Sequence, residues 1–233
     1  MDPKNIFDEW SKKYDQWFET PIGKLIKKFE NTLILEMLKP KGGEKILDPG
    51  CGTGIFTDDV LKTGAQVVGL ELSMPMLLGA SKKRMDYPLY LVQGDMRALP
   101  FDKDTFDKTI SVTAIEFIED ARGAIEELFR VTRPGGCIVV ATLNRLSPWA
   151  SRRAEAAKKD HPIFKHVFFR SPEDMLALAS SAGVFKTAVH FQKDDDPEEA
   201  EVTECACRNR GLETGAFLVV RWIKPNPEKL ESM

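Results

Sequence analysis

Residues 44–54 read EKILDPGCGTG, a pattern that predicts a buried strand, then a glycine-rich turn, then a helix. Gly50, Gly52 and Gly54 permit backbone dihedrals that a Cβ would forbid, and they let main-chain N–H groups approach a bound molecule closely. Asp48 adds a carboxylate beside the turn. A tight turn without a ligand is the simpler interpretation, but alternate glycines behind an acid exceed what such a turn requires. We therefore expect a ligand site here.

The length of the chain indicates one large α/β domain, and its net charge gives no overall drive toward a polyanionic partner. The 233 residues are 42% hydrophobic, which is enough for a full core. A formal net charge of -3 gives no general attraction to nucleic acid or to an anionic membrane. The first residues are polar, and no run approaches the ~18 apolar residues of a spanning helix, so we expect a cytoplasmic protein. The sequence does not indicate an oligomeric state.

The cysteines predict reduced thiols and no metal centre. Cys51, Cys137, Cys205 and Cys207 form no C-x-x-C pair, and a chain of this size does not need disulfides. Cys205 and Cys207 alone would make a poor zinc site, because the chain contains only three histidines. The acidic run 194–199 is interpreted as a solvated loop rather than a cation site.

Residues 1–40 predict a helical cap in two pieces, separated at Pro21. The second piece carries an apolar stripe at helical spacing, formed by Ile22, Leu25, Ile26, Phe29, Leu33 and Met37. The first piece is rich in aromatic residues, namely Phe7, Trp10, Tyr14, Trp17 and Phe18, with Ile6 beside them. Tyr14 and Trp17 either cover the sheet or close over a ligand as a lid.

Between residues 41 and 223 we expect the α/β core. Strands are predicted at 44–48, 66–70, 89–93, 106–112 and 137–142, and helices at 53–61, from 75 and at 120–132. A further helix is expected over 171–182, followed by strands at 184–191 and 215–223 that pair as an antiparallel edge hairpin. Residues 224–233 are expected to be a loose tail.

Residues 143–170 interrupt the alternation and are interpreted as an insertion on the substrate side. The part from 152 to 170 carries six Lys or Arg against two acids. An insertion after a sheet strand, at the end where ligands bind in doubly wound folds, is a natural place for substrate recognition. Its candidates for substrate contact are Trp149, Arg152 and His166. A solvated helix with packed phenylalanines is the alternative interpretation.

Three acids mark the ends of neighbouring predicted strands: Asp48, Glu71 and Asp95. The carboxyl ends of parallel strands open onto one crevice, so these acids and the glycine turn should line a single slot. An acid at the end of the second strand suits a ribose diol. The spacing G-x-G-x-G differs from the dinucleotide pattern G-x-G-x-x-G, and the preceding acid would repel pyrophosphate but suit an ammonium group. S-adenosylmethionine (SAM) fits best.

Four motifs in order make the sequence resemble the class I SAM-dependent methyltransferases, in the small-molecule branch grouped with the ubiquinone and menaquinone methyltransferases. They are ILDPGCGTG at 46–54, VGLELS at 68–73, QGDM at 93–96 with LPF at 99–101, and RPGG at 133–136. The resemblance implies a Rossmann-like, doubly wound, mostly parallel sheet of seven strands with an antiparallel last strand. Glu71 stands where many members have Asp.

The resemblance also implies roles for individual residues. Gly50, Gly52 and Gly54, with the Cys51 backbone, would line the methionine part of SAM, and Asp48 would lie near its ammonium group. Glu71 would bind the ribose and Leu72 would pack on the adenine. The amine of the adenine would be held by Asp95 and the Met96 backbone. Residues near the sulfonium would be Ser111, Val112 and Thr113.

The sequence does not single out a catalytic base. Methyl transfer needs a base only when the attacking atom must lose a proton. Candidates are Tyr14, Glu116, Asp120, His161 and His166.

After the fourth strand the chain has SVTA at 111–114, without the Asn/Asp-Pro-Pro-Tyr/Phe motif of enzymes that methylate DNA bases or protein glutamine, so we expect a small-molecule acceptor. A SAM-binding regulator without turnover, or a methyltransferase for tRNA or protein, remains the alternative; an NAD-dependent oxidoreductase conflicts with the glycine spacing.

Overall fold

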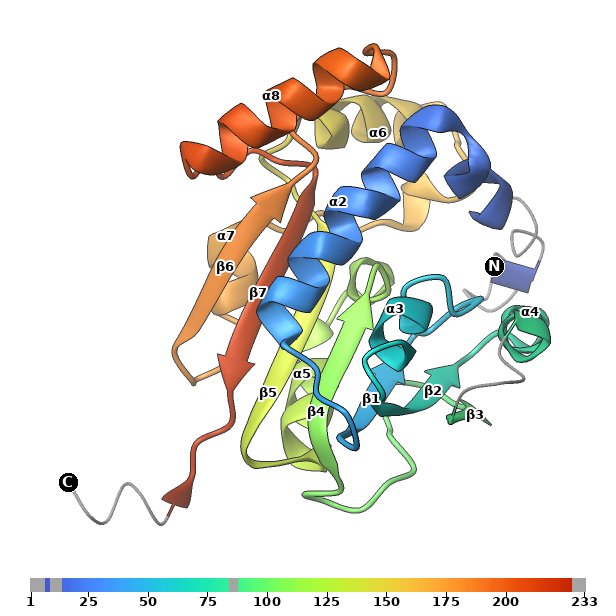
Figure 1. Ribbon diagram of the computed structural model, residues 1–233, viewed down its shortest axis with the longest axis vertical. Helices are drawn as coiled ribbons and strands as arrows, with labels where there is room; N and C mark the ends of the chain where they lie inside the picture. Colours follow the sequence, from blue (N-terminus) through green and yellow to red (C-terminus); the bar gives the residue numbers. More distant parts are fainter. Residues whose placement is uncertain (1–6, 9–13, 84–87, 228–233) are drawn as a thin grey trace.

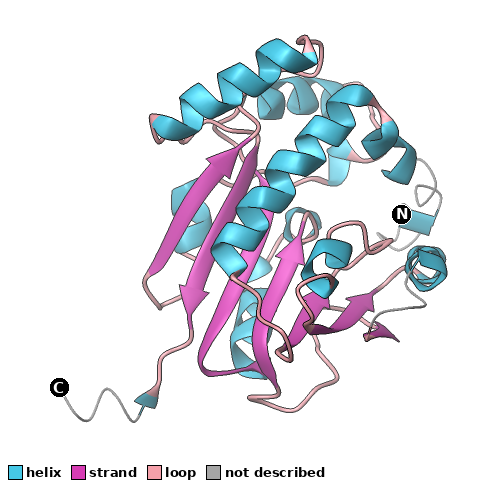
Figure 2. Ribbon diagram, in the orientation of Figure 1, coloured by secondary structure: helices cyan, strands magenta, loops and turns pink. Residues whose placement is uncertain are grey.

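The computed structural model describes residues 7–8, 14–83 and 88–227, built around a seven-stranded sheet with helices on both faces (Figures 1 and 2). The strand order is β3-β2-β1-β4-β5-β7-β6. The strands are β1 (Lys45–Pro49), β2 (Gln66–Glu71), β3 (Leu89–Gln93), β4 (Phe106–Val112), β5 (Thr132–Leu143), β6 (Gly183–Ala188) and β7 (Phe217–Ile223). Only β7 runs antiparallel to its neighbours. The predicted fold is confirmed.

The helices form two layers around the sheet. α2 (Pro21–Leu38) and α3 (Thr57–Leu61) cover one face, and α5 (Ala121–Val131) and α7 (Pro172–Leu176) cover the other. Successive side chains of a strand point to opposite faces, so Val139 packs in the core under α2 and Val140 in the core under α5. The other helical elements are α4 (Met74–Lys83), η1 (Ile115–Phe117), α6 (Pro148–Lys158), η2 (Phe164–His166) and α8 (Pro197–Asn209).

The sheet topology determines where a ligand can bind. From β1 the chain adds β2 and then β3 on one side, whereas β4 and β5 follow on the other side. Helices that start from neighbouring strands at this reversal therefore lie on opposite faces and leave a crevice at the carboxyl ends of β1 and β4. The glycine turn lies at the end of β1.

The N-terminal cap breaks where the sequence predicts. Residues 14–19 are helical, and α2 starts at Pro21, after Thr20 has accepted a hydrogen bond from the Gly23 N–H on its Oγ1 (3.1 Å). Proline suits the first turn of a helix because the N–H that it lacks has no partner there. The predictions for Ile6 and Trp10 fall outside the described residues.

Two local predictions are wrong. The helix expected over 171–182 ends at Leu176, because the Arg122 guanidinium takes up the Ala177 carbonyl (2.9 Å) that a longer helix would use. The acidic run is not a free loop: Asp196 accepts the Glu198 N–H (2.9 Å) and caps α8, an unpredicted helix between the two edge strands. Those strands, β6 and β7, pair antiparallel as expected.

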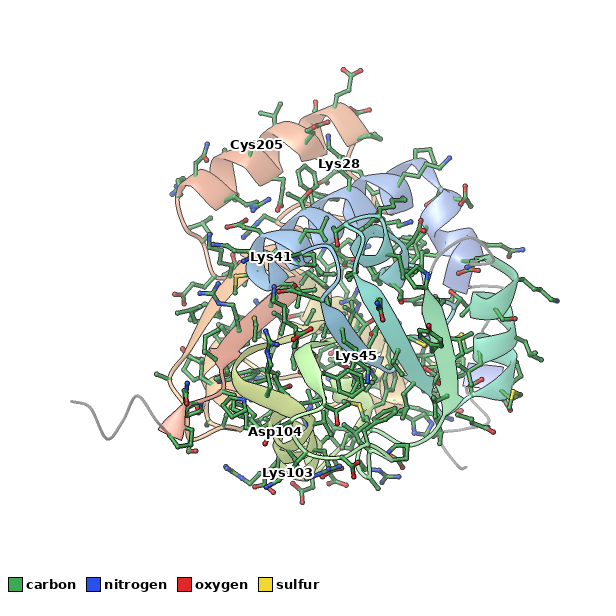
Figure 3. All side chains as sticks on the ribbon, turned by 60° about the horizontal axis from the view of Figure 1, so that its bottom comes forward. Lys28, Lys41, Lys45, Lys103, Asp104 and Cys205 are labelled. Atoms are coloured by element: carbon green, nitrogen blue, oxygen red, sulfur yellow. The ribbon has the colours of Figure 1, made fainter. Side chains whose placement is uncertain are left out.

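α8 packs beside α2 on the outside of the molecule, so the cap is tied to the edge of the sheet. Figure 3 shows Lys28 on α2 reaching toward α8, where it forms an ion pair with Glu201, and Cys205 on the exposed side of α8. All four cysteines are free thiols, as predicted. Within the described part of the chain, every helix is too short or too polar to cross a bilayer.

Candidate active site

The turn after β1 has the backbone geometry that requires glycine. Gly50 and Gly52 have φ of +80° and +55°. A Cβ on Gly50 would lie 2.4 Å from the Ala114 Cβ, whereas a Cβ on Gly52 would meet no atom within 4 Å. Gly50 therefore lets the turn pack against the chain after β4, whereas none of the described residues packs against the Cα of Gly52 on its Cβ side. Both residues line the same large cavity.

Glu71, at the end of β2, connects this turn to the start of α4. Its Oε2 accepts the Gly52 N–H (3.0 Å), and its Oε1 accepts the Ser73 N–H (2.9 Å). The side chain is buried, and this burial raises the pKa of the carboxyl despite both hydrogen bonds. A carboxylate is thus held at the cavity wall by backbone donors.

Asp48 lies beneath the turn. Its Oδ2 accepts a hydrogen bond from the Thr57 Oγ1 (2.6 Å), and burial raises its pKa to about 7. Asp48 and Glu71 repel each other, which adds to this rise. A positively charged group in the cavity would relieve both penalties, because it would favour the ionised carboxylates.

The segment after β3 forms the opposite edge of the slot. Arg97 Nη2 donates to the Asp95 Oδ2 (2.5 Å), and this hydrogen bond lowers the Asp95 pKa. Met96 is buried beside it, and Leu72 faces it from the end of β2. Leu72, Asp95, Met96 and Arg97 all line the cavity together with the glycine turn. The resemblance implies cofactor contacts for the first three, whereas Arg97 was not predicted.

Residues after β4 divide into supporting and lining positions. Ser111 is fully buried outside the cavity lining, where its Oγ donates to the Pro49 carbonyl (2.8 Å) and fixes the end of β1. Val112 and Thr113 line the cavity. Thr113 has φ of +49°, a strained value for a β-branched residue, which turns the chain sharply at the cavity wall. Gly54, past the turn, packs toward Ala80 of α4.

One cavity of 670 Å³ extends from the glycine turn to an aromatic compartment under the cap. We call this compartment the acceptor chamber. Its wall is formed by Tyr14, Trp17, Glu30, Thr113, Glu116, Trp149, Arg152, Arg153, His161 and Phe164, from the cap, η1, α6 and η2. The N-terminal cap and the 143–170 insertion, which are far apart in sequence, therefore meet over one space.

The cap is bonded to the cofactor side of the cavity. Thr53, in the glycine-rich turn, donates its hydroxyl to the Asp15 Oδ1 (2.6 Å), and Ser73 donates to the Asp8 Oδ1 (2.5 Å). Tyr14 OH lies 3.4 Å from the Thr113 Oγ1. These contacts hold the first cap helix against the slot, and Lys193 lies over the outer ring of Trp17 (5.2 Å).

The structure places most of the predicted base and substrate-contact residues in the cavity wall and two of them outside it. Tyr14, Trp17, Glu116, Trp149, Arg152 and His161 all line the cavity. Asp120 does not reach it: the residue is exposed on the surface just before α5. His166 also lies outside the cavity lining, and within the described chain its buried Nε2 has no hydrogen-bond partner. Neither of these two candidates therefore lines the cavity.

Glu30 and Arg153 were not predicted, although both line the acceptor chamber. Glu30 lies on the buried face of α2, between Ile26 and Leu33. A charged residue within an apolar helical stripe was the signal in the sequence that marked it, because such a position normally favours a hydrophobic residue. Arg153 follows Trp149 by one helical turn, which places both side chains on one face of α6.

The residues of the cavity wall suit SAM. No described residue lies within 4 Å of a Cβ built on Gly52, and the wall supplies carboxylates at Glu71 and Asp95 that accept hydrogen bonds from hydroxyl and amine groups. The acids near the turn suit a cationic ligand.

Comparisons with known proteins agree with this geometry. Residues 47–140 match the model of a family described as a methyltransferase domain. The demethylmenaquinone methyltransferase of Corynebacterium kroppenstedtii is 30% identical over 178 residues, 76% of this chain and 76% of that protein.

Two solved structures share the fold. A SAM-dependent methyltransferase of Thermotoga maritima has a TM-score of 0.68 and 24% identity, covering 94% of this chain and 99% of that chain. Phosphoethanolamine N-methyltransferase 2 of Haemonchus contortus, solved in complex with SAM, has a TM-score of 0.63 and 16% identity, covering 94% of this chain and 60% of that chain. The chain therefore belongs to the class I SAM-dependent methyltransferases, with SAM as its cofactor, and resembles the demethylmenaquinone methyltransferases among them.

Proposed function

We propose that this enzyme methylates a small molecule enclosed in the acceptor chamber. The observation that carries the proposal is the continuous 670 Å³ cavity, which joins the glycine turn to a chamber roofed by the cap. Cavities of a few hundred Å³ with mainly apolar walls and a few polar groups are typical of small-molecule sites. The similarity to a protein named for a quinone precursor supports the same class of acceptor.

We propose the following contacts for the cofactor. Glu71 binds the ribose hydroxyls, because its carboxylate is already fixed by two backbone N–H groups at the end of β2. Asp95 and the Met96 backbone bind the adenine amine, and Leu72 packs against the ring. Asp48 offsets the positive charge of the methionyl group. The cavity at Gly52 accommodates the tail.

When bound, SAM supplies a methyl group on a sulfonium sulfur, which an acceptor atom attacks in line. The contribution of the protein is to hold the acceptor in line and to exclude water. Thr113, at its strained turn, separates the cofactor slot from the chamber, and Tyr14 closes on it from the cap. The aromatic wall keeps water away from the reacting atoms.

Glu116 is the best placed of the predicted bases. It is 1% exposed, its Oε2 accepts a hydrogen bond from Thr142 (3.2 Å), and burial raises its pKa to about 7. A carboxyl with this pKa accepts a proton from an O–H or N–H group near neutral pH. Desolvation in the cavity wall raises the pKa of Tyr14 above its usual range, so its hydroxyl stays neutral and shares a hydrogen bond with the Thr113 hydroxyl.

Two measurements test the proposal. Titration calorimetry with S-adenosylhomocysteine should give saturable binding at one site. Incubation with methyl-labelled SAM and a cell extract, followed by separation by size, should place the label in the small-molecule fraction. Absence of binding would refute the cofactor assignment. Label confined to tRNA or protein, or no label in any fraction despite binding, would refute a small-molecule acceptor.

A further inference from the structure

An arginine in the acceptor chamber carries a buried N–H group that no described residue satisfies. Arg153, on α6, lies over the ring of Trp149 (5.0 Å from the ring centre) and beside that of Phe164 (5.7 Å). Its Nη1 is buried and has no hydrogen-bond partner among the residues that the structure describes. The aromatic contacts hold the guanidinium in one plane but leave this N–H group unsatisfied.

Two carboxyl groups share the chamber with Arg153 without pairing with it. Glu30 on α2 and Glu116 on η1 lie close enough to interact with the guanidinium through space, yet neither forms an ion pair with it. Within the described chain, Glu30 also has no hydrogen-bond donor. The guanidinium and the two carboxyl groups therefore line the same cavity without an ion pair between them.

The two kinds of group respond differently to burial. A buried carboxyl can take up a proton and become neutral, and burial does raise the pKa of Glu30 to about 8 and that of Glu116 to about 7. An arginine cannot lose its charge in this way. The Nη1 of Arg153 therefore requires an acceptor of hydrogen bonds, and a negatively charged acceptor would meet this requirement best.

We propose that Arg153 selects methyl acceptors that carry a carboxylate, and that Glu30 and Glu116 face an O–H or N–H group of the same molecule. This inference rests on the proposed function, since it specifies the molecule that the chamber takes. A single guanidinium matches a single negative charge. A phosphate dianion fits less well, because its second charge would face the two glutamates.

The reaction balances with these groups. The oxygen or nitrogen of the acceptor attacks the methyl carbon and forms the new bond. The carbon–sulfur bond breaks, its electron pair stays on sulfur, and the acceptor's proton passes to the carboxylate of Glu116. The carboxylate of the acceptor is not consumed and only fixes the molecule against Arg153.

The test uses compounds that differ in charge but not in shape. The full-length protein is saturated with S-adenosylhomocysteine and titrated by calorimetry with 4-hydroxybenzoate and, separately, with its neutral isostere 4-hydroxybenzamide. The wild type should bind the acid about tenfold or more tightly than the amide, the effect of one charge-assisted hydrogen bond. R153M should bind the two compounds within about threefold of each other.

The control is K158M, which removes a positive charge from the exposed side of the same helix, where Lys158 pairs with Glu155 (2.6 Å). It should keep the wild-type preference. A wild type that does not prefer the acid would overturn the proposal without any variant, and so would an R153M that keeps the preference while binding S-adenosylhomocysteine normally. If R153M does not fold, R153Q replaces it. Loss of S-adenosylhomocysteine binding by the wild type would instead refute the proposed function.

Discussion

Replacing Glu30 by glutamine should change how the stability of the protein depends on pH. Glu30 is 9% exposed in the chamber wall, and burial raises its pKa from 4.5 to about 8. The folded protein therefore holds this proton more tightly than the unfolded chain. A carboxyl of this kind contributes its full stabilisation below pH 4.5 and loses it as the pH rises through 8.

The size of the effect follows from the pKa. Between about pH 6 and about pH 9 the wild type should lose about 3 kcal/mol of unfolding free energy through Glu30 alone. Glutamine does not titrate, so the free energy of unfolding of E30Q relative to the wild type should rise by about this amount over the same interval. Asp48, Glu71 and Glu116 have pKa values raised in the same direction, and they contribute to both proteins.

The assay is urea unfolding of the SAM-free protein, followed by circular dichroism at both ends of the interval. E36Q is the matched control on the same helix. The hydrogen bond to Lys186 lowers the pKa of Glu36, so the stabilisation by its carboxylate is already complete above pH 4.5. The difference in unfolding free energy between E36Q and the wild type should therefore be the same at both pH values. If the difference in unfolding free energy between E30Q and the wild type is also the same at both pH values, the raised pKa of Glu30 is refuted, because Glu30 would then be ionised in the folded state throughout the interval.

Two further predictions concern the cofactor slot. E71A should bind S-adenosylhomocysteine about ten- to a hundredfold more weakly in calorimetry, because a charge-assisted hydrogen bond is lost. The control E126A changes an exposed residue and should bind normally. Equal affinities of E71A and the wild type would contradict the assignment of Glu71 to the ribose. G50A should lower the free energy of unfolding by about 1–3 kcal/mol, because its φ is +80° and its Cβ would collide with Ala114. G123A, on an exposed helix position, should instead be neutral or stabilising, and a G50A protein as stable as the wild type would show that the turn relaxes.

The sheet could be predicted because its signals are local. The strands β2, β3 and β4 begin where the pattern of apolar residues predicts. β2 is buried from Val67 onward, which shows in the sequence as a continuous apolar run up to Leu70. α8 escaped prediction because its acidic first turn resembles a solvated run. Only its cap at Asp196 and its packing beside α2 distinguish it.

The cofactor slot could also be predicted, since its residues lie at the ends of successive strands. Asp48, Glu71 and Asp95 are far apart in sequence, but a parallel sheet brings such positions to one edge. The two predicted candidates that do not line the cavity, Asp120 and His166, were chosen for similar reasons. Asp120 was chosen because it follows β4 in the chain and His166 because it lies in the insertion, and neither position in the sequence tells whether the side chain lines the cavity.

The sequence by itself determined the sheet, the glycine turn and the class of cofactor, because each depends on residues near one another in the chain or on a repeated strand–helix unit. The acceptor chamber was decided only by the tertiary structure. Glu30 on α2, Glu116 on η1 and Arg153 on α6 meet there, and their separations in sequence leave no periodic pattern. Burial raises the pKa of Glu30, and it removes water from the Arg153 Nη1, which has no hydrogen-bond partner among the described residues. Burial is a property of the assembled fold.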